Sequence, residues 1–179
     1  MISIDEPGQT SLAPDFTDPL GLLKACHTRI LSHCDLLEKI MRYLDEQEMD
    51  QQVTDASRRV HRYFSTAGKL HHMDEEQDIF PRLSPISIAL ADTIDTLQQD
   101  HIAIEGLWDK ISPALNNPHT ITAQQLPILT TISTKFCTLI RKHIQLEEQE
   151  LLPIAIQSIS DSELEIIGDS MKYRRNLPT

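Results

Sequence analysis

Two stretches of the sequence share one pattern: HHMDEEQDIFP at residues 71–81 and HIQLEEQELLP at residues 143–153. In both stretches a histidine is followed four residues later by a pair of glutamates and ten residues later by a proline. Residues four apart lie on the same face of a helix. Each stretch therefore places a histidine and a glutamate side by side. Single histidines, His27 and His101, precede the two stretches by 44 and 42 residues. The chain thus resembles two similar helical hairpins.

Apolar residues at steps of three and four predict four long amphipathic helices around these motifs. They cover residues 19–45, 53–80, a segment that starts between 87 and 92 and ends at 115, and 123–152. Pro81 and Pro85 are expected to end the second helix, and Pro153 follows the fourth. The short connections favour an all-α fold, an up-down-up-down four-helix bundle.

Capping patterns extend this picture to the C-terminus. Thr122 with Gln125 resembles a capping box at the start of the fourth helix, and Ser160 with Glu163 resembles another. The latter predicts a short extra C-terminal helix over residues 161–173. We therefore expect three segments: a flexible leader (1–18), the bundle (19–155), and a C-terminal helix and tail (156–179). Arg174 and Arg175 are expected in a solvated tail.

Composition excludes several classes of partner. The formal net charge of −11 repels phosphate groups, so we expect no nucleic acid and no anionic membrane as partner. No run of 18 apolar residues is present, so no membrane span is expected. The three cysteines form no CxxC pair. With the lack of a signal-like N-terminus, this fits a cytoplasmic protein.

Ionisable residues interrupt all four apolar stripes. The six are His27, His71, Glu75, His101, His143 and Glu147. Burying such groups is unfavourable unless something compensates them, and a metal cluster does so. Helix rise places three of the histidines at one height. His101 matches them only if its helix begins near Asp92, because a start near Ser87 shifts it by roughly 7 Å.

The number of donors favours two metals over one. Four histidines and two carboxylates exceed the needs of one tetrahedral zinc, and imidazoles suit iron, zinc, copper or nickel. Divided between two metals, they give each metal two histidines and one oxygen from each bridging glutamate. A bridging oxide or hydroxide adds a fifth donor, which leaves one position of a six-coordinate iron open.

Other residues are assigned to the surroundings of the site. Glu105, one turn after His101, is a candidate seventh ligand, an occupant of the open position, or a hydrogen-bond partner of a ligand. His72 lies about 100° from His71 around the helix and is expected near the site or on the surface. Trp108 packs in the core or forms the wall of a dry ligand pocket. The remaining acidic residues near the motifs are expected on the surface: Asp74, Glu76, Asp78, Glu148 and Glu150.

The chain resembles the hemerythrin-like (HHE) cation-binding domains, most closely the bacterial stand-alone members. The resemblance covers residues 19–155 and rests on four stretches: Cys26-His27-Thr28-Arg29-Ile30, His71-His72 through Asp74-Glu75-Glu76 to Ile79-Phe80-Pro81, Asp100-His101, and His143 through Glu147-Glu148 to Leu152-Pro153. It implies two iron ions bridged by two carboxylates and an oxo or hydroxo group. The implied ligands are His27, His71, Glu75, His101, His143 and Glu147.

Two departures distinguish this chain from the oxygen-carrying hemerythrins. Those proteins have a second histidine where this chain has Glu105. Their last carboxylate is an aspartate five residues after the final histidine, whereas Glu147 follows His143 by four. Both departures argue against reversible oxygen storage.

The resemblance implies binding of, or reaction with, a small oxidant (O2, NO or peroxide). The setting would be stress response, sensing or iron handling rather than enzymatic catalysis, and the sequence identifies no redox partner. The alternatives are a metal-free or mononuclear-metal interaction scaffold and a ferritin-like di-iron oxidase. The latter class uses Glu-x-x-His motifs, which this sequence lacks.

Overall fold

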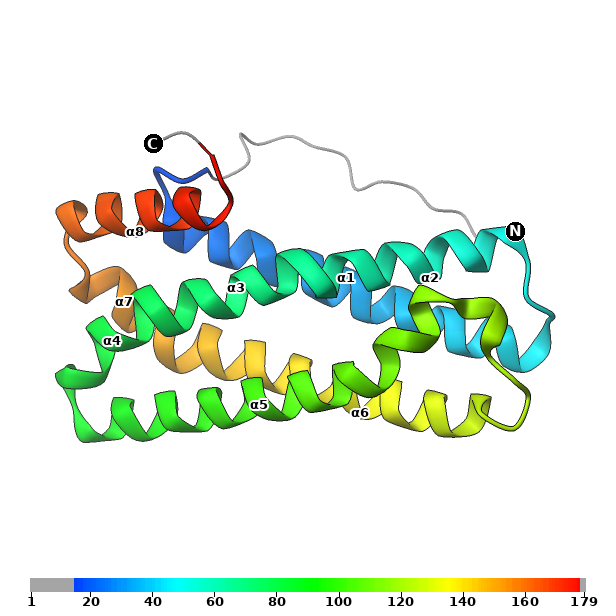
Figure 1. The fold of residues 1–179 in the computed structure, drawn as a ribbon. Coiled ribbons are helices and arrows are strands. Elements are labelled where there is room, and N and C mark those ends of the chain that lie inside the picture. Colours follow the sequence, from blue (N-terminus) through cyan, green and yellow to red (C-terminus); the bar gives the residue numbers. More distant parts are fainter. Residues whose placement is uncertain (1–14, 178–179) are drawn as a thin grey trace.

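A computed structural model describes residues 15–177 of the chain as four antiparallel helical columns with a fifth helix at one end (Figure 1). The first column is α1 (Pro19–Glu46) and the third is α5 (Ile88–Asn116). The second combines α2 (Gln51–Tyr63), η1 (Phe64–Gly68), α3 (Lys69–Asp74), η2 (Glu75–Ile79) and α4 (Phe80–Leu83). The fourth combines α6 (Leu126–Leu146), η5 (Glu147–Leu151) and α7 (Leu152–Ser158).

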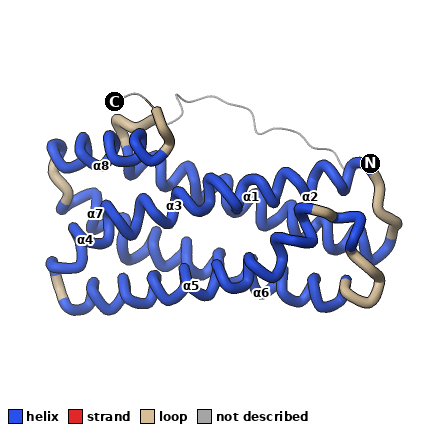
Figure 2. The backbone as a smooth tube through the Cα atoms, viewed as in Figure 1, coloured by secondary structure: helices blue, strands red, loops and turns tan. Residues whose placement is uncertain are grey.

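The predicted all-α, up-down-up-down bundle is confirmed. Every regular element in the described part of the chain is helical (Figure 2). Short 3₁₀ turns, η3 (Ser84–Ile86) and η4 (Pro118–Thr120), lie in the connections. The extra helix, α8 (Asp161–Arg174), packs against α1 and α3. The predicted leader, 1–18, falls mostly on residues 1–14, which lie outside the described residues.

Polar side chains begin most of these helices. The carboxylates of Asp18 and Asp50 accept hydrogen bonds from the N–H groups of the first turns of α1 and α2, and the Ser87 hydroxyl caps α5. The Ser160–Glu163 capping box of α8 is present as predicted. Thr122 and Gln125 also exchange the expected hydrogen bonds, although α6 itself begins at Leu126.

The second and fourth columns run past Pro81 and Pro153, contrary to the expected ends at residues 80 and 152, although the second column does end before Pro85. A π-helical turn precedes each proline: the Phe80 N–H donates to the Glu75 carbonyl, and the Leu152 N–H donates to the Glu147 carbonyl. Each π turn starts a new hydrogen-bond ladder, so Pro81 and Pro153 fall in a first turn, where a missing N–H costs little. The columns therefore continue to Leu83 and Ser158.

This continuation also places His101. Its helix begins at Ile88, close to the earlier of the two expected starts, yet His101 reaches the height of the other histidines. His71 lies twelve residues before the end of α4, and His101 lies thirteen residues after the start of α5. The expected displacement of roughly 7 Å is wrong because the second column is longer than its proline suggested.

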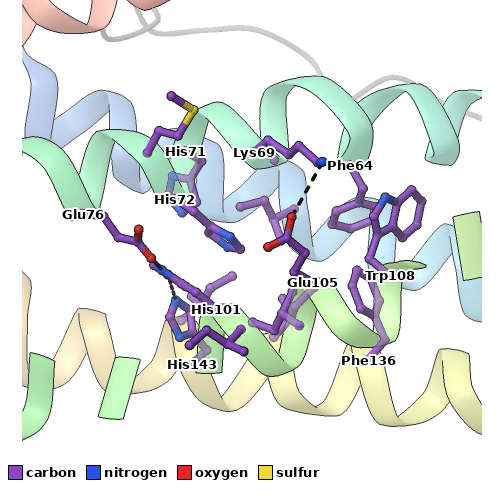
Figure 3. Close-up of a pocket in the computed structure, with 17 residues that line it drawn as sticks. Phe64, Lys69, His71, His72, Glu76, His101, Glu105, Trp108, Phe136 and His143 are labelled. Atoms are coloured by element: carbon purple, nitrogen blue, oxygen red, sulfur yellow. Dashed lines mark hydrogen bonds and ion pairs between the residues drawn. The ribbon is translucent and has the colours of Figure 1, made fainter. Parts of the chain in front are cut away.

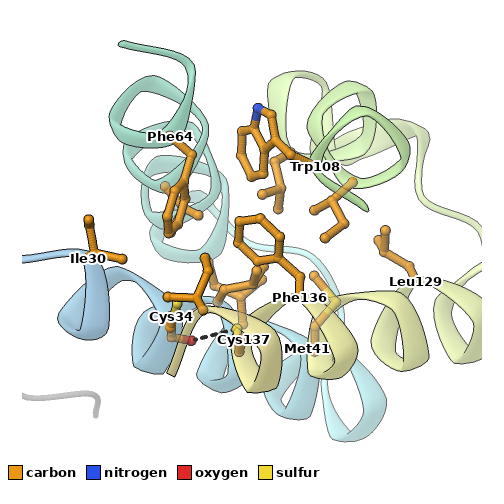
Figure 4. Packing of buried hydrophobic residues seen from close by; sticks show 14 of the residues in the cluster. Ile30, Cys34, Met41, Phe64, Trp108, Leu129, Phe136 and Cys137 are labelled. Atoms are coloured by element: carbon orange, nitrogen blue, oxygen red, sulfur yellow. Dashed lines mark hydrogen bonds between the residues drawn. The ribbon is translucent and has the colours of Figure 1, made fainter. Parts of the chain in front are cut away.

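Two apolar cores fill the bundle, one on each side of a polar layer. The core at the α2 end includes Phe64, Trp108 and Phe136 (Figure 4). Cys34 also packs there as a small hydrophobe and accepts a hydrogen bond at its carbonyl from the Cys137 thiol. The other core lies beneath α8. At the start of α6, Leu129 is buried and Ile128 is 65% exposed.

Candidate metal centre

Six buried side chains meet in the polar layer between the two cores, one histidine from each column and a glutamate from two of them. They form two groups, one of His27, His71, Glu75 and Glu147, and another of Glu75, His101, His143 and Glu147. Within each group, one donor atom from every residue lies within 4.8 Å of the others. The six residues are at most 4% exposed. The two glutamates belong to both groups.

The distances place each glutamate between two histidines of different hairpins. Glu75 Oε1 lies 3.0 Å from His71 Nε2, and Glu75 Oε2 lies 3.4 Å from His101 Nε2. Glu147 Oε2 lies 3.2 Å from His27 Nε2 and 3.6 Å from His143 Nε2. A carboxylate that faces donors from both sides has the geometry of a bridge between two cations.

Although these donor atoms lie close together, several of them lack the geometry of a hydrogen bond and so have no hydrogen-bond partner. They are His27 Nε2, both ring nitrogens of His71, His143 Nδ1, Glu75 Oε2 and both carboxylate oxygens of Glu147. Unpaired buried donors and acceptors are rare, because each costs about 1–3 kcal/mol. The unpaired atoms are nitrogen and carboxylate oxygen, the donor set that suits a transition metal. The residues present therefore fit a dinuclear metal group.

The second glutamate of each pair is exposed, as the sequence predicted, and it also contacts the site. Glu148 accepts a hydrogen bond from His27 Nδ1 at 3.0 Å, and Glu76 accepts one from His101 Nδ1 at 2.7 Å. Both carboxylates are partly exposed but reach inward to the opposite hairpin. Such contacts turn Nε2 toward a metal and fix the tautomer of the ring. The paired glutamates in the sequence could have revealed these contacts. The residue that follows a proposed ligand points about 100° away from it around the helix, toward the neighbouring helix.

Without a metal, the layer holds opposite charges. Burial lowers the pKa of His27, but Glu147 and Glu75 outweigh it and raise that pKa to about 9. Burial also opposes charge on His71 and His101, yet the nearby carboxylates raise the pKa of both. Glu75 is the counterpart, since the histidines around it hold its pKa well below the usual value despite its burial. A metal ion would replace these protons.

A cavity of about 330 Å³ lies beside the layer, between α3 and α5 (Figure 3). Trp108 lines it, and so does His72, whose ring stacks on His101 with centroids 3.9 Å apart. Glu105 stands at this cavity and is 63% exposed, with Oε1 3.8 Å from Lys69 Nζ. It belongs to neither donor group. Its expected role as a ligand remains a hypothesis.

The C-terminal arginines contact the motif instead of forming a solvated tail. Arg174 Nε lies 2.8 Å from Asp74 Oδ1, and its guanidinium also pairs with Asp78. Arg175 Nη2 lies 2.6 Å from Asp74 Oδ2. Both aspartates, expected on the surface, are buried. They flank Glu75, so α8 holds the turn that carries this glutamate.

Comparisons with known proteins agree with this geometry. The family model of the hemerythrin HHE cation-binding domain matches residues 18–155. An uncharacterized protein of Haemophilus influenzae is 29% identical over 162 residues, which are 90% of this chain and 92% of that protein. No helix among residues 15–177 is long and apolar enough to cross a membrane.

Proposed function

Because the chain belongs to the hemerythrin HHE cation-binding domain family, we propose that it is a non-haem di-iron protein. It binds or reacts with a small oxidant (O2, NO or peroxide) in stress response, sensing or iron handling, in the cytoplasm. Its cofactor is a pair of iron ions bridged by two carboxylates and an oxo or hydroxo group. The metal ligands are His27, His71, Glu75, His101, His143 and Glu147.

One observation carries the proposal: the two four-residue donor groups share both glutamates. A mononuclear site needs no shared carboxylates, whereas two adjacent cations need bridges to offset their mutual repulsion. Both carboxylate oxygens of Glu147, one of Glu75 and the ring nitrogens of His71 have no hydrogen-bond partner in the layer. A ferritin-like oxidase receives less support, because that class draws most of its ligands from carboxylates.

The chain itself prepares the site for a bound oxidant. When bound, two ferrous ions supply two electrons and an open coordination position. Glu76 and Glu148 hold the Nδ1 protons of His101 and His27, so that the Nε2 atoms stay free to bind. The two apolar cores exclude bulk water from both sides of the layer, and the cavity beside His101 and His143 leaves one open approach.

Optical spectroscopy tests this proposal. The full chain is loaded with ferrous iron without oxygen and is then exposed to oxygen. We expect near-ultraviolet charge-transfer bands from a bridged diferric site, and their loss in Glu75→Ala and Glu147→Ala. A protein that takes up iron but develops no such bands would contradict the dinuclear assignment.

A further inference from the structure

The cavity beside the metal layer has two chemically different ends. His101 and His143 line one end, where their rings face the layer. Phe64, Trp108 and Phe136 line the other end with aromatic surface (Figure 3). Its lining also includes two large hydrophobic residues that are open to solvent, Met73 at 39% and Ile102 at 65% exposure. Apolar side chains therefore line both the solvent-exposed rim and the aromatic end of the cavity, alongside polar ones such as Lys69 and Glu105.

The cavity is much larger than a diatomic ligand requires. A water molecule occupies roughly 30 Å³ in the liquid, and O2 or NO is of similar size. A volume of about 330 Å³ is instead at the lower end of the range of small-molecule pockets, about 300–1,000 Å³. The cavity as a whole thus has room for a hydrocarbon body of the size of a substituted benzene ring.

The charges around the cavity favour an uncharged ligand. Among the lining residues, Lys69 is the one lysine or arginine, and it already pairs with Glu105. Glu76 is likewise engaged, because it accepts a hydrogen bond from His101. A carboxylate or phosphate would meet these acidic groups in a chain of net charge −11. The two carboxylates in the lining, Glu76 and Glu105, already have partners, so an organic cation would have to compete for them.

We propose that this cavity binds an organic hydroperoxide, with its hydrocarbon body among the aromatic side chains and its peroxide end toward His101 and His143. This inference rests on the proposed function and narrows its oxidant to one class. The O–O bond of ROOH breaks as the hydroperoxide takes two electrons and two protons. The products are one alcohol, ROH, and one water. Two ferrous ions held by the proposed ligands would supply one electron each, and solvent would supply the protons.

Trp108, the single tryptophan of the chain, reports binding without any reaction. Cumyl alcohol, the reduced product of cumene hydroperoxide, is titrated into the full chain in its iron-loaded and metal-free forms. We expect a saturable change in tryptophan fluorescence in both forms. No saturable change at millimolar concentrations, in either form, would overturn the proposal.

Two glycine substitutions locate the binding site. Gly68 lines the cavity, and the nearest atom to a Cβ built there is Phe64 Cδ1 at 3.3 Å. Gly106 lies on α5 outside the cavity lining, with nothing within 4 Å of its Cβ position. We expect Gly68→Leu to weaken cumyl alcohol binding about tenfold or more by filling the cavity, and Gly106→Leu to leave it unchanged. Equal affinity in the two variants would contradict the assignment.

A second pair of variants covers the case in which Gly68→Leu does not fold. Ile102 and Ile88 are both exposed isoleucines on α5, but only Ile102 lines the cavity. Ile102→Asp should weaken binding several-fold through a charge in the lining, whereas Ile88→Asp should not. Equal binding by these two proteins would overturn the proposal.

Reaction of the iron-loaded protein separates this inference from the proposed function. We expect one cumene hydroperoxide to be reduced to cumyl alcohol per diferrous site. Gly68→Leu should lower the preference for cumene hydroperoxide over hydrogen peroxide about tenfold. An unchanged preference would contradict the cavity as the hydroperoxide site. If the chain holds no iron, the proposed function fails, while the fluorescence titration of the metal-free form still decides whether the cavity binds the alcohol.

Discussion

The two repeated motifs have the same backbone around their proposed ligands but are supported by different contacts. In both, a histidine lies one turn before a glutamate, a π turn follows, and a proline restarts the helix. The first motif is held by ion pairs, since Asp74 and Asp78 are buried against Arg174 of α8. The corresponding positions of the second motif are Leu146, which packs on the apolar core, and Glu150, which is exposed. The ligand geometry is thus repeated while the outer contacts have diverged.

Acidification is expected to have the largest effect on metal content, because it protonates the proposed ligands of both motifs at once. Bound metal requires neutral imidazoles, and the pKa of metal-free His27 is raised to about 9. Protons therefore compete with metal as the pH falls below that value. We expect complete release by about pH 4, near the ordinary pKa of carboxylates. Metal content after dialysis at stepwise lower pH measures this, and full retention at pH 4 would contradict it.

The stability of the metal-free protein should change with pH in the opposite direction to metal binding: it should fall as the pH rises. A histidine with a raised pKa stabilises the folded state below its unfolded value of 6.5, and this stability is lost as the pH rises through about 9. The melting temperatures of the two forms should therefore diverge across this range. As the pH rises, that of the iron-loaded form should increase relative to that of the metal-free form.

Removing one histidine from either motif should abolish the dinuclear site equally. We expect His71→Ala and His143→Ala each to bind about one metal or fewer per chain and to lose most of the metal-dependent stability, about 4 kcal/mol at a thousandfold excess of metal over its Kd. The control is His119→Ala, at an exposed residue remote from the site. Metal titration with thermal unfolding measures both effects. A large difference between the two motifs would show that one of them carries the site alone.

Much of this site was accessible from the sequence, because helical periodicity alone places the six donors on inward faces. The helix ends were predicted wrongly at Pro81 and Pro153, since a π turn shifts the hydrogen-bond ladder and periodicity does not reveal it. The contacts of Asp74 with Arg174 and Arg175 join residues about a hundred positions apart. Local patterns carry no information about such pairs.

Because the first motif is held by ion pairs, a substitution outside its proposed ligands should destabilise the protein more than such a substitution in the second motif. Asp74→Leu introduces the leucine that the second motif has at the corresponding position. It also leaves two arginines without their carboxylate partner. We expect it to lower the free energy of unfolding by about 3 kcal/mol. Glu150→Ala, in the second motif, should change it by less than about 0.5 kcal/mol. Urea unfolding of both variants measures the difference, and equal values would mean that α8 contributes little support.

Substitution of the second glutamate in each pair should have a smaller effect, on metal affinity, and this effect should be equal in the two motifs. Glu76→Gln and Glu148→Gln keep the size of the side chain but remove the charge that faces His101 and His27. We expect each to weaken metal affinity about tenfold. Competition with a chelator measures the affinity, and Gln149→Glu, a charge change beside Glu148, serves as a control. An unchanged affinity in both variants would mean that these exposed glutamates do not support the metal site.

The central claim is that donors from both hairpins hold two metals between shared carboxylates. Iron analysis of the anaerobically reconstituted full chain tests it most directly. We predict about two iron ions per chain, both lost together in Glu75→Ala, because each donor group needs this carboxylate. A chain that retains less than about half an iron after reconstitution, or one iron that survives the loss of Glu75, would contradict the account.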